Sequence, residues 1–153
     1  MATKARQLLI AEAGMAMQAY QRSTQAFDDA VGRALGLNPT DLRCLDWLVD
    51  GPKAAGELSA ATGLSTAATT ALIDRLERRA FVRRVRDAVD RRRVLVEMTA
   101  DGAERVGAYY GPLLREGSAT LTDLSDDQIR LMRDWLLAAR ELTDRHCERI
   151  RGA

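Results

Sequence analysis

The chain of 153 residues has few of the residue types on which several protein classes depend. Its one histidine, His146, and its two cysteines, Cys44 and Cys147, are too few for a disulfide framework or for most zinc sites, so we expect no metal and no cofactor. No apolar run reaches the ~18 residues of a membrane span, and the first residues lack a signal-peptide pattern. We therefore expect a cytoplasmic protein with no membrane partner.

Catalytic motifs are missing as well. The chain has no glycine-rich phosphate loop and no Gly-x-Ser-x-Gly nucleophile motif. His146 and Cys147 are adjacent on a predicted helix, where neighbours point about 100° apart, so they do not face each other as a catalytic pair. We predict that the protein is not an enzyme. Cys44 is expected to be a small buried apolar residue, and whether either cysteine senses redox state depends on exposure, which the sequence leaves open.

Proline is also scarce, and the three prolines and most glycines fall near predicted boundaries, a pattern typical of long helices with short connections. Asn38-Pro39, Ser65, Thr99 and Ser125 are predicted to begin helices, the last with a capping box to Gln128. Two β-branched runs around a charged tip predict a hairpin. The predicted helices cover residues 4–35, 39–50, 55–62, 65–79 and 125–150, and a further helix is predicted to begin at Thr99 and to include Leu114. The predicted strands cover 81–86 and 94–98.

The near-zero net charge of +1 argues at first against a nucleic-acid-binding protein. The charges are unevenly distributed, however. Residues 74–93 hold nine arginines and four acids, a local charge of +5, so the other 133 residues sum to −4. All nine are arginine, which pairs with phosphate and enters narrow minor grooves. An ordinary solvated charge run is the alternative interpretation of this segment.

The segment before and within this basic run predicts a helix-turn-helix. Residues 55–62 and 65–79 are joined by a tight turn at Gly63. Thr69, Leu72, Ile73 and Leu76 recur at helical spacing and should face the core. Small side chains on the outward face would allow close approach to the major groove, whereas a plain helical hairpin remains the alternative. The outward residues are Ser65, Thr66, Ala67, Thr70, Ala71, Arg75 and Arg78.

A basic hairpin after such a helix pair indicates a winged helix-turn-helix. At its tip, Asp90 is predicted to pair with Arg92 and hold the hairpin's geometry, while Arg91 and Arg93 point to the other side. The run from Leu72 to Arg78, Val82-Arg83-Arg84, Asp90-Arg91-Arg92, Val94-Leu95-Val96 and Met98-Thr99 resembles the MarR family of bacterial transcriptional regulators. The similarity covers roughly residues 35–142.

This resemblance implies a mainly α fold with a small β-hairpin wing, in which a winged helix-turn-helix is flanked by N- and C-terminal dimerisation helices. The implied domains are residues 1–36 for the N-terminal dimerisation helix, 37–99 for DNA binding, and 100–153 for C-terminal dimerisation helices that form one unit with 1–36. It implies double-stranded DNA as partner, contacted by Ser65, Thr66, Thr70, Arg75, Arg78, Arg84, Asp90, Arg91 and Arg92. A small aromatic effector is a further implied partner, and Tyr20, Trp47, Tyr109 and Tyr110 could line its pocket, although core packing is the alternative for these aromatics.

Three positions depart from the family's pattern. Ala80 stands where a glycine usually ends the recognition helix, so a left-handed alanine is expected there, at a cost of about 1 kcal/mol. Ala54 replaces the usual Ser/Thr cap of the third helix. Ala71 replaces a long polar side chain, which shifts specificity toward DNA shape and methyl contacts.

The last predicted helix has an apolar stripe about 22 residues long with no core of its own beneath it. Packing against a second copy would bury it, whereas a monomeric six-helix bundle is the alternative. Two recognition helices would then match a pseudo-palindrome with half-sites about one helical turn apart. The sequence thus predicts a homodimeric repressor that an effector releases; a winged-helix docking or architectural module without operator specificity is the rival.

Overall fold

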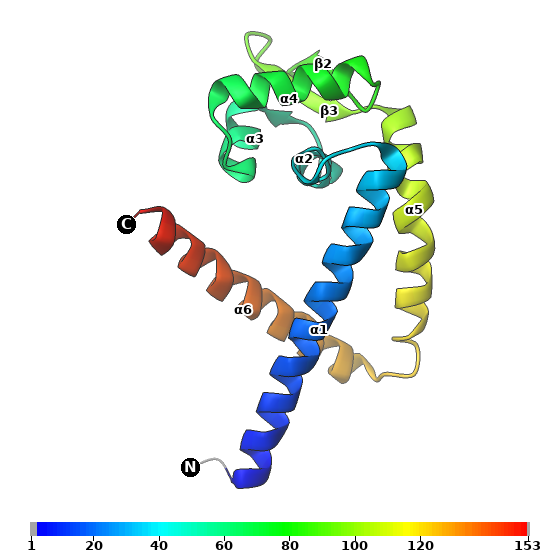
Figure 1. Ribbon diagram of the computed structural model, residues 1–153, viewed down its shortest axis with the longest axis vertical. Coiled ribbons are helices and arrows are strands. Elements are labelled where there is room, and N and C mark those ends of the chain that lie inside the picture. Colours follow the sequence, from blue (N-terminus) through cyan, green and yellow to red (C-terminus); the bar gives the residue numbers. More distant parts are fainter. Residues whose placement is uncertain (1–2, 153) are drawn as a thin grey trace. The chain divides into compact units, whose positions relative to one another are not determined.

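The computed structural model describes residues 3–152 of the chain. It confirms a mainly α fold with a small antiparallel sheet (Figure 1). The chain divides within its fifth helix into two compact units, one ending at Tyr109 and one beginning at Tyr110. The elements are α1 (Lys4–Leu35), α2 (Pro39–Val49), β1 (Lys53–Ala54), α3 (Ala55–Thr62), α4 (Thr66–Arg78), β2 (Val82–Arg86), β3 (Val94–Met98), α5 (Ala100–Ala119) and α6 (Asp126–Arg151).

The helices of the first unit begin where the sequence predicts them. Asn38 and Asp41 form a reciprocal capping box at the start of α2, with Pro39 as its first residue. The Ser65 hydroxyl accepts a hydrogen bond from the Ala68 N–H at the start of α4. Such caps satisfy backbone donors that have no partner inside the helix. At α3 only half of this arrangement exists, because Ala54 has no side-chain acceptor and Glu57 alone accepts from its N–H.

The sheet has the strand order β1-β3-β2. β2 and β3 form the predicted hairpin, in which Val82 pairs with Met98 and Arg86 with Val94. β1 was not predicted from the sequence. It has only two residues, which pair with Leu95 and Val96 of β3, and a strand this short gives no periodic signal. The wing is therefore anchored to the helical lobe along β3.

The core lies between the helix-turn-helix and the sheet. Thr69, Leu72, Ile73 and Leu76 are all buried, as predicted for the inner face of α4. The three apolar residues among them belong to a cluster of apolar side chains on α2, α3, α4, β2, β3 and their connections. The buried members of this cluster are Leu37, Cys44, Leu45, Leu48, Leu58, Leu72, Ile73, Leu76, Phe81, Val82 and Val96.

Close contacts connect the C-terminal end of α4 with the start of α5. Ala80 has the expected left-handed conformation, with φ of +60°. Its carbonyl accepts from the Thr99 hydroxyl at 2.5 Å, and that hydroxyl caps α5 by accepting from the Gly102 N–H at 2.9 Å. A Cβ on Gly102 would lie 2.3 Å from the carbonyl oxygen of Phe81, so only glycine fits this contact. The start of α5 is thereby fixed to the end of α4.

The second unit consists of the rest of α5 and the whole of α6. Ser125 and Gln128 form the predicted capping box at the start of α6. None of the residues of α6 is buried, and its exposed apolar side chains include Leu131, Trp135 and Leu142. The long stripe predicted from the sequence thus has no core beneath it. Among the described residues, no helix combines the length and apolar character that a membrane crossing requires.

Candidate nucleic-acid interface

The outward face of α4 carries small side chains, as the sequence predicts. Thr66, Ala67, Thr70 and Ala71 are exposed along the helix, with Ser65 exposed at its N-terminal end. The Thr70 hydroxyl donates to the Thr66 carbonyl oxygen at 3.0 Å and keeps its lone pairs available as acceptors. With no long side chain over this stretch, the helix backbone can approach a partner surface closely. Small hydroxyl and methyl side chains are also the kind that major-groove-binding helices use for close approach.

Arg75, predicted on this outward face, is instead half-buried. Its guanidinium donates to Oδ1 of Asp41 from Nε at 3.2 Å and from Nη2 at 2.5 Å. Asp41 is only 2% exposed, and its other oxygen accepts from the Asn38 N–H. The pair joins α4 to the start of α2. Asp41 was not singled out from the sequence, because a contact across 34 positions leaves no local signal.

Three further arginines near the end of α4 also have acceptors within the fold. Arg84 on β2 donates to Asp74 at 2.6 Å and to Glu77, both on α4, and these bonds raise its pKa. Arg83 bonds to Glu97 across the hairpin at 2.7 Å. Arg79 donates to the Leu35 carbonyl oxygen at 2.6 Å and to that of Gly36 at 2.5 Å, at the end of α1. These guanidiniums hold α1, α4 and the sheet together.

Arg79 and a second arginine enclose Phe81, which is completely buried. The guanidinium carbon of Arg105 on α5 lies 3.9 Å from the centre of the Phe81 ring, and that of Arg79 lies 5.5 Å away. Arg105 also donates to the Arg79 carbonyl oxygen at 3.0 Å. Within the first unit, the end of α4 is therefore attached to both α1 and α5. Neither role was predicted, since each depends on contacts between distant elements.

The wing tip, residues 87–93, is held by main-chain bonds. Asp87 Oδ1 accepts from the Val89 N–H at 2.8 Å, and this bond is the main reason that the pKa of Asp87 is lowered. Asp90 Oδ1 accepts from the Arg92 N–H at 3.0 Å. The predicted Asp90–Arg92 contact thus exists, but it is made by the backbone N–H of Arg92, and the Arg92 guanidinium makes no ion pair within residues 3–152. Arg93, predicted to point away, lies 3.6 Å from Asp87.

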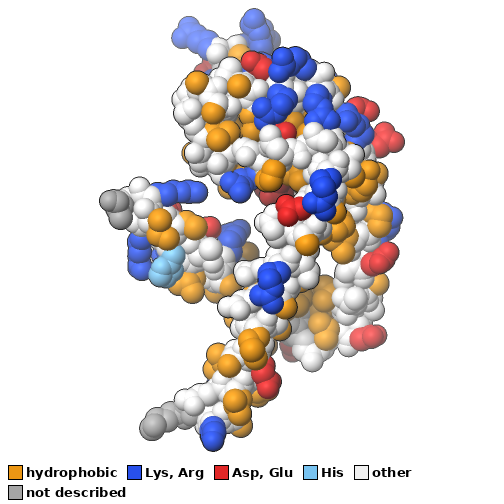
Figure 2. Space-filling view, viewed as in Figure 1, with side chains coloured by type: hydrophobic (Ala, Val, Ile, Leu, Met, Phe, Trp, Pro, Cys, Tyr) orange, Lys and Arg blue, Asp and Glu red, His pale blue; other side chains and the backbone are white. Residues whose placement is uncertain are grey.

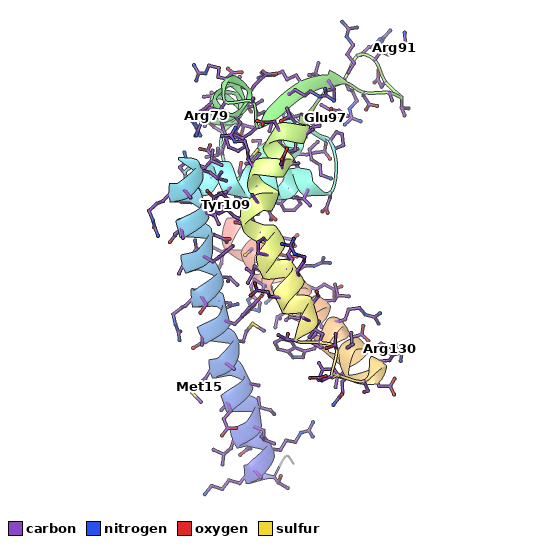
Figure 3. The ribbon with its side chains drawn as sticks, turned by 90° about the vertical axis from the view of Figure 1, so that its right-hand side faces the viewer. Met15, Arg79, Arg91, Glu97, Tyr109 and Arg130 are labelled. Carbon is purple, nitrogen blue, oxygen red and sulfur yellow. The ribbon has the colours of Figure 1, made fainter. Side chains whose placement is uncertain are left out.

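The nine arginines of residues 74–93 therefore divide into two groups. Arg75, Arg79, Arg83, Arg84 and Arg93 have carboxylate or carbonyl partners. The other four are exposed and make no ion pair with any described residue, and we call them the open arginines. They are Arg78, Arg86, Arg91 and Arg92. Figure 2 shows basic side chains gathered over α4 and the wing, and Figure 3 shows Arg91 extending at the far end of the wing.

The cysteines and the histidine belong to other elements, α2 and α6. Cys44 is buried as predicted, and burial together with the negative charge of Asp41 raises its pKa to about 12. Its thiol is therefore poorly reactive. Cys147 and His146 are both exposed on α6. No group of three or more His, Cys, Asp or Glu residues with the geometry of a metal site occurs within residues 3–152.

The four aromatic residues predicted for an effector pocket lie on three helices. Tyr20 on α1 is 65% exposed, Trp47 on α2 is 46% exposed and Tyr109 on α5 is 41% exposed. Tyr109 is labelled in Figure 3. Tyr110 is the first residue of the second unit. Core packing, the alternative for these aromatics, therefore does not describe Tyr20, Trp47 or Tyr109 within this chain.

Comparisons with known proteins agree with this geometry. Residues 35–93 match the sequence profile of the MarR family. YcgE of Bacillus subtilis (strain 168), an uncharacterised HTH-type transcriptional regulator, is 35% identical over 129 residues, which cover 84% of each chain.

Solved structures show the same fold. A MarR family protein from Bacillus stearothermophilus has a TM-score of 0.65 with 24% identity, over 94% of this chain and 99% of its own. The F27L mutant of MepR from S. aureus, solved bound to an oligodeoxyribonucleotide, has a TM-score of 0.56 with 17% identity, over 85% of this chain and 96% of its own. With the helix-turn-helix, the wing and the similarity to YcgE together, the chain belongs to the MarR family of winged helix-turn-helix transcriptional regulators and is a DNA-binding protein.

Proposed function

We propose that the protein is a cytoplasmic repressor that binds a pseudo-palindromic operator as a homodimer. In this proposal the N-terminal half of α4 enters the major groove, with Ser65, Thr66 and Thr70 at bases or phosphates. The wing lies beside it, and Arg92 extends toward the minor groove. A dimer that covers a promoter would exclude the transcription machinery from it.

The observation that carries this proposal is the group of open arginines. An arginine already bonded to a carboxylate contributes little extra attraction for phosphate, whereas Arg78, Arg91 and Arg92 are exposed without an acidic partner. Their charge is available to release counterions from DNA. Arg86 was not among the predicted DNA contacts, and its exposure adds it to them. Arg75 and Arg84 stay predictions as DNA contacts, because a phosphate would have to share them with carboxylates.

The homodimer is supported by the apolar side chains that the single chain leaves uncovered. Leu8, Leu9 and Ile10 of α1 are more than half exposed, as is Leu131 of α6 at 72%. Burying such stripes between copies would give a large apolar interface. In this proposal residues 1–36 and 100–153 form the dimerisation region, and residues 37–99 form the DNA-binding domain. Residues 1, 2 and 153 of these ranges lie outside the part of the chain that the structure describes. The monomeric six-helix bundle is the competing arrangement.

We further propose that a small aromatic effector lowers operator affinity by binding near Tyr20, Trp47, Tyr109 and Tyr110. The support is the exposure of the first three side chains, which offers aromatic surface for stacking. For release, the effector must bind the DNA-free conformation more tightly than the bound one. A panel of phenolic and other aromatic acids, added to the protein–operator complex, tests this part separately.

Footprinting on the DNA upstream of the protein's own gene tests the central proposal. We expect one protected region with two related half-sites about one helical turn apart, and analytical ultracentrifugation should give the mass of two chains. Binding without any protected region would favour the rival, a winged-helix docking or architectural module.

A further inference from the structure

The wing tip carries an apolar side chain that no part of the proposed function uses. Val89 is 95% exposed, the highest value among the large apolar side chains of residues 3–152. Single exposed apolar residues are common on protein surfaces and need no explanation by themselves. Val89 differs because of its position, two and three residues from the open arginines Arg91 and Arg92.

The loop around Val89 holds this side chain outward. The Val89 N–H donates to Asp87 Oδ1 at 2.8 Å, and the Asp90 N–H reaches the same oxygen at 3.4 Å. Main-chain bonds from Asp87 to Arg93 at 3.0 Å and from Arg93 to Asp90 at 2.9 Å close the loop behind it. A β-branched side chain has restricted χ1 rotation, so little side-chain entropy remains to be lost when it makes a contact.

We propose that Val89 is a specificity-determining residue of the wing, whose methyl groups pack on the floor of the DNA minor groove between the phosphates bound by the open arginines. This inference rests on the proposed function, because it requires that the wing enter the minor groove. Apolar side chains inserted into the minor groove are a recurrent way of reading its shape. The arginines would be attracted to the negative potential of the narrow groove. The valine would make van der Waals contact only where no group protrudes from the floor of the groove.

The chemistry of the minor groove predicts which base pairs Val89 would favour. An A·T pair shows only acceptors on this floor, whereas a G·C pair adds the exocyclic amino group of guanine. That amino group protrudes and needs a hydrogen-bond acceptor, which a valine lacks. Val89 should therefore discriminate against G·C under the wing. An inosine·cytosine pair, which lacks the amino group, should be accepted like A·T.

Salt dependence separates an apolar contact from a charged one. Counterion release depends on the number of phosphates neutralised, so an apolar contact changes affinity by the same factor at every salt concentration. Val89→Thr keeps the shape and β-branching but makes one methyl position polar. If about half of the valine's transfer free energy is gained at each of two wings, the variant should bind about tenfold more weakly.

The test measures operator binding by fluorescence anisotropy across a range of KCl concentrations for the full-length protein. The variants are Val89→Thr, Arg92→Ala and Val49→Thr, the last a matched control at a valine on α2 that is 70% exposed. Each binds three operators that carry A·T, G·C or inosine·cytosine under the wing. We expect Val89→Thr to lower affinity about tenfold with an unchanged salt slope and a smaller penalty for G·C; Val49→Thr should match the wild type.

The outcomes separate this inference from the proposed function. A wild-type complex that Val89→Thr weakens by less than about twofold, or a G·C penalty that the variant keeps in full, overturns the role of Val89 alone. A G·C penalty that inosine·cytosine shares also overturns it, because the amino group would then not be what is read. If the wild type forms no specific complex, the proposed function fails and this inference fails with it.

Discussion

The two ends of the basic segment use the same residue type for opposite purposes. Around the end of α4, Arg75, Arg79 and Arg84 are bonded to Asp41, to carbonyls of α1 and to Asp74 and Glu77. At the wing tip, Arg91 and Arg92 make no ion pair with any described residue, and nearby Asp87 and Asp90 accept from main-chain N–H groups. This difference shows that a local charge of +5 does not mean five charges available to bind DNA, because several of the arginines are bonded to other parts of the fold.

The largest expected effect is at Arg75. Arg75→Ala would leave Asp41 buried without its cationic partner, and we expect the free energy of unfolding to fall by about 2–3 kcal/mol in urea denaturation. Arg78→Ala, one helical turn away at an open arginine, is the matched control and should change stability by less than about 0.5 kcal/mol. Equal stability of the two variants would contradict the division of the arginines into structural and open ones.

Substitutions at the wing should affect DNA binding rather than stability. Arg92→Ala should leave unfolding unchanged but weaken operator binding, and the slope of log affinity against log salt should become shallower by about 0.9 for each wing. Arg86 is an open arginine that was not among the predicted DNA contacts, and Arg86→Ala should also weaken operator binding and make the salt dependence shallower. Affinity that stays unchanged at matched salt would refute the assignment of Arg92 to the wing contact.

Arg84 should give a smaller effect of the structural kind. Its partners Asp74 and Glu77 are partly exposed, so Arg84→Ala should lower the free energy of unfolding by only about 0.5–1 kcal/mol. High salt should shrink that loss, because it screens exposed charges. Arg83→Ala, which removes a similar pair with Glu97, provides the comparison. A loss that persists undiminished in high salt would mean that packing, rather than charge, holds Arg84.

The smallest effect concerns the titration of Asp87. Its pKa is lowered mainly by the hydrogen bond from the Val89 N–H, so the carboxylate form stabilises the wing loop. This contribution is present above the pKa of an unfolded aspartate and is lost as pH falls through the lower, folded value. The Val89 amide resonance should therefore shift at a pH below the ordinary range of aspartate. A midpoint within the ordinary range would contradict the bond; Asp87→Asn should abolish the transition.

Much of this fold could be predicted because its signals are local. Helix starts at Asn38, Ser65 and Ser125 depend on residues three positions apart, and the buried face of α4 follows from helical spacing. Even the left-handed Ala80 was expected from the family's pattern. β1 was not predicted, because a strand of two residues is too short to show an alternation of apolar and polar side chains. The residues assigned to DNA contact, Ser65 and Arg92 among them, stay predictions that the operator experiments address.

The sequence by itself determined the helices, the hairpin, most helix caps and the location of the basic segment, because hydrophobic period and capping act between residues a few positions apart. Only the tertiary structure decided which arginines remain open. Arg75 meets Asp41 from 34 positions away, and Arg79 meets the Gly36 carbonyl from 43. Such pairs form when packing brings helices together, and no local pattern records them. The same packing left Val89 and Arg92 at the tip of the wing without side-chain partners in the described chain.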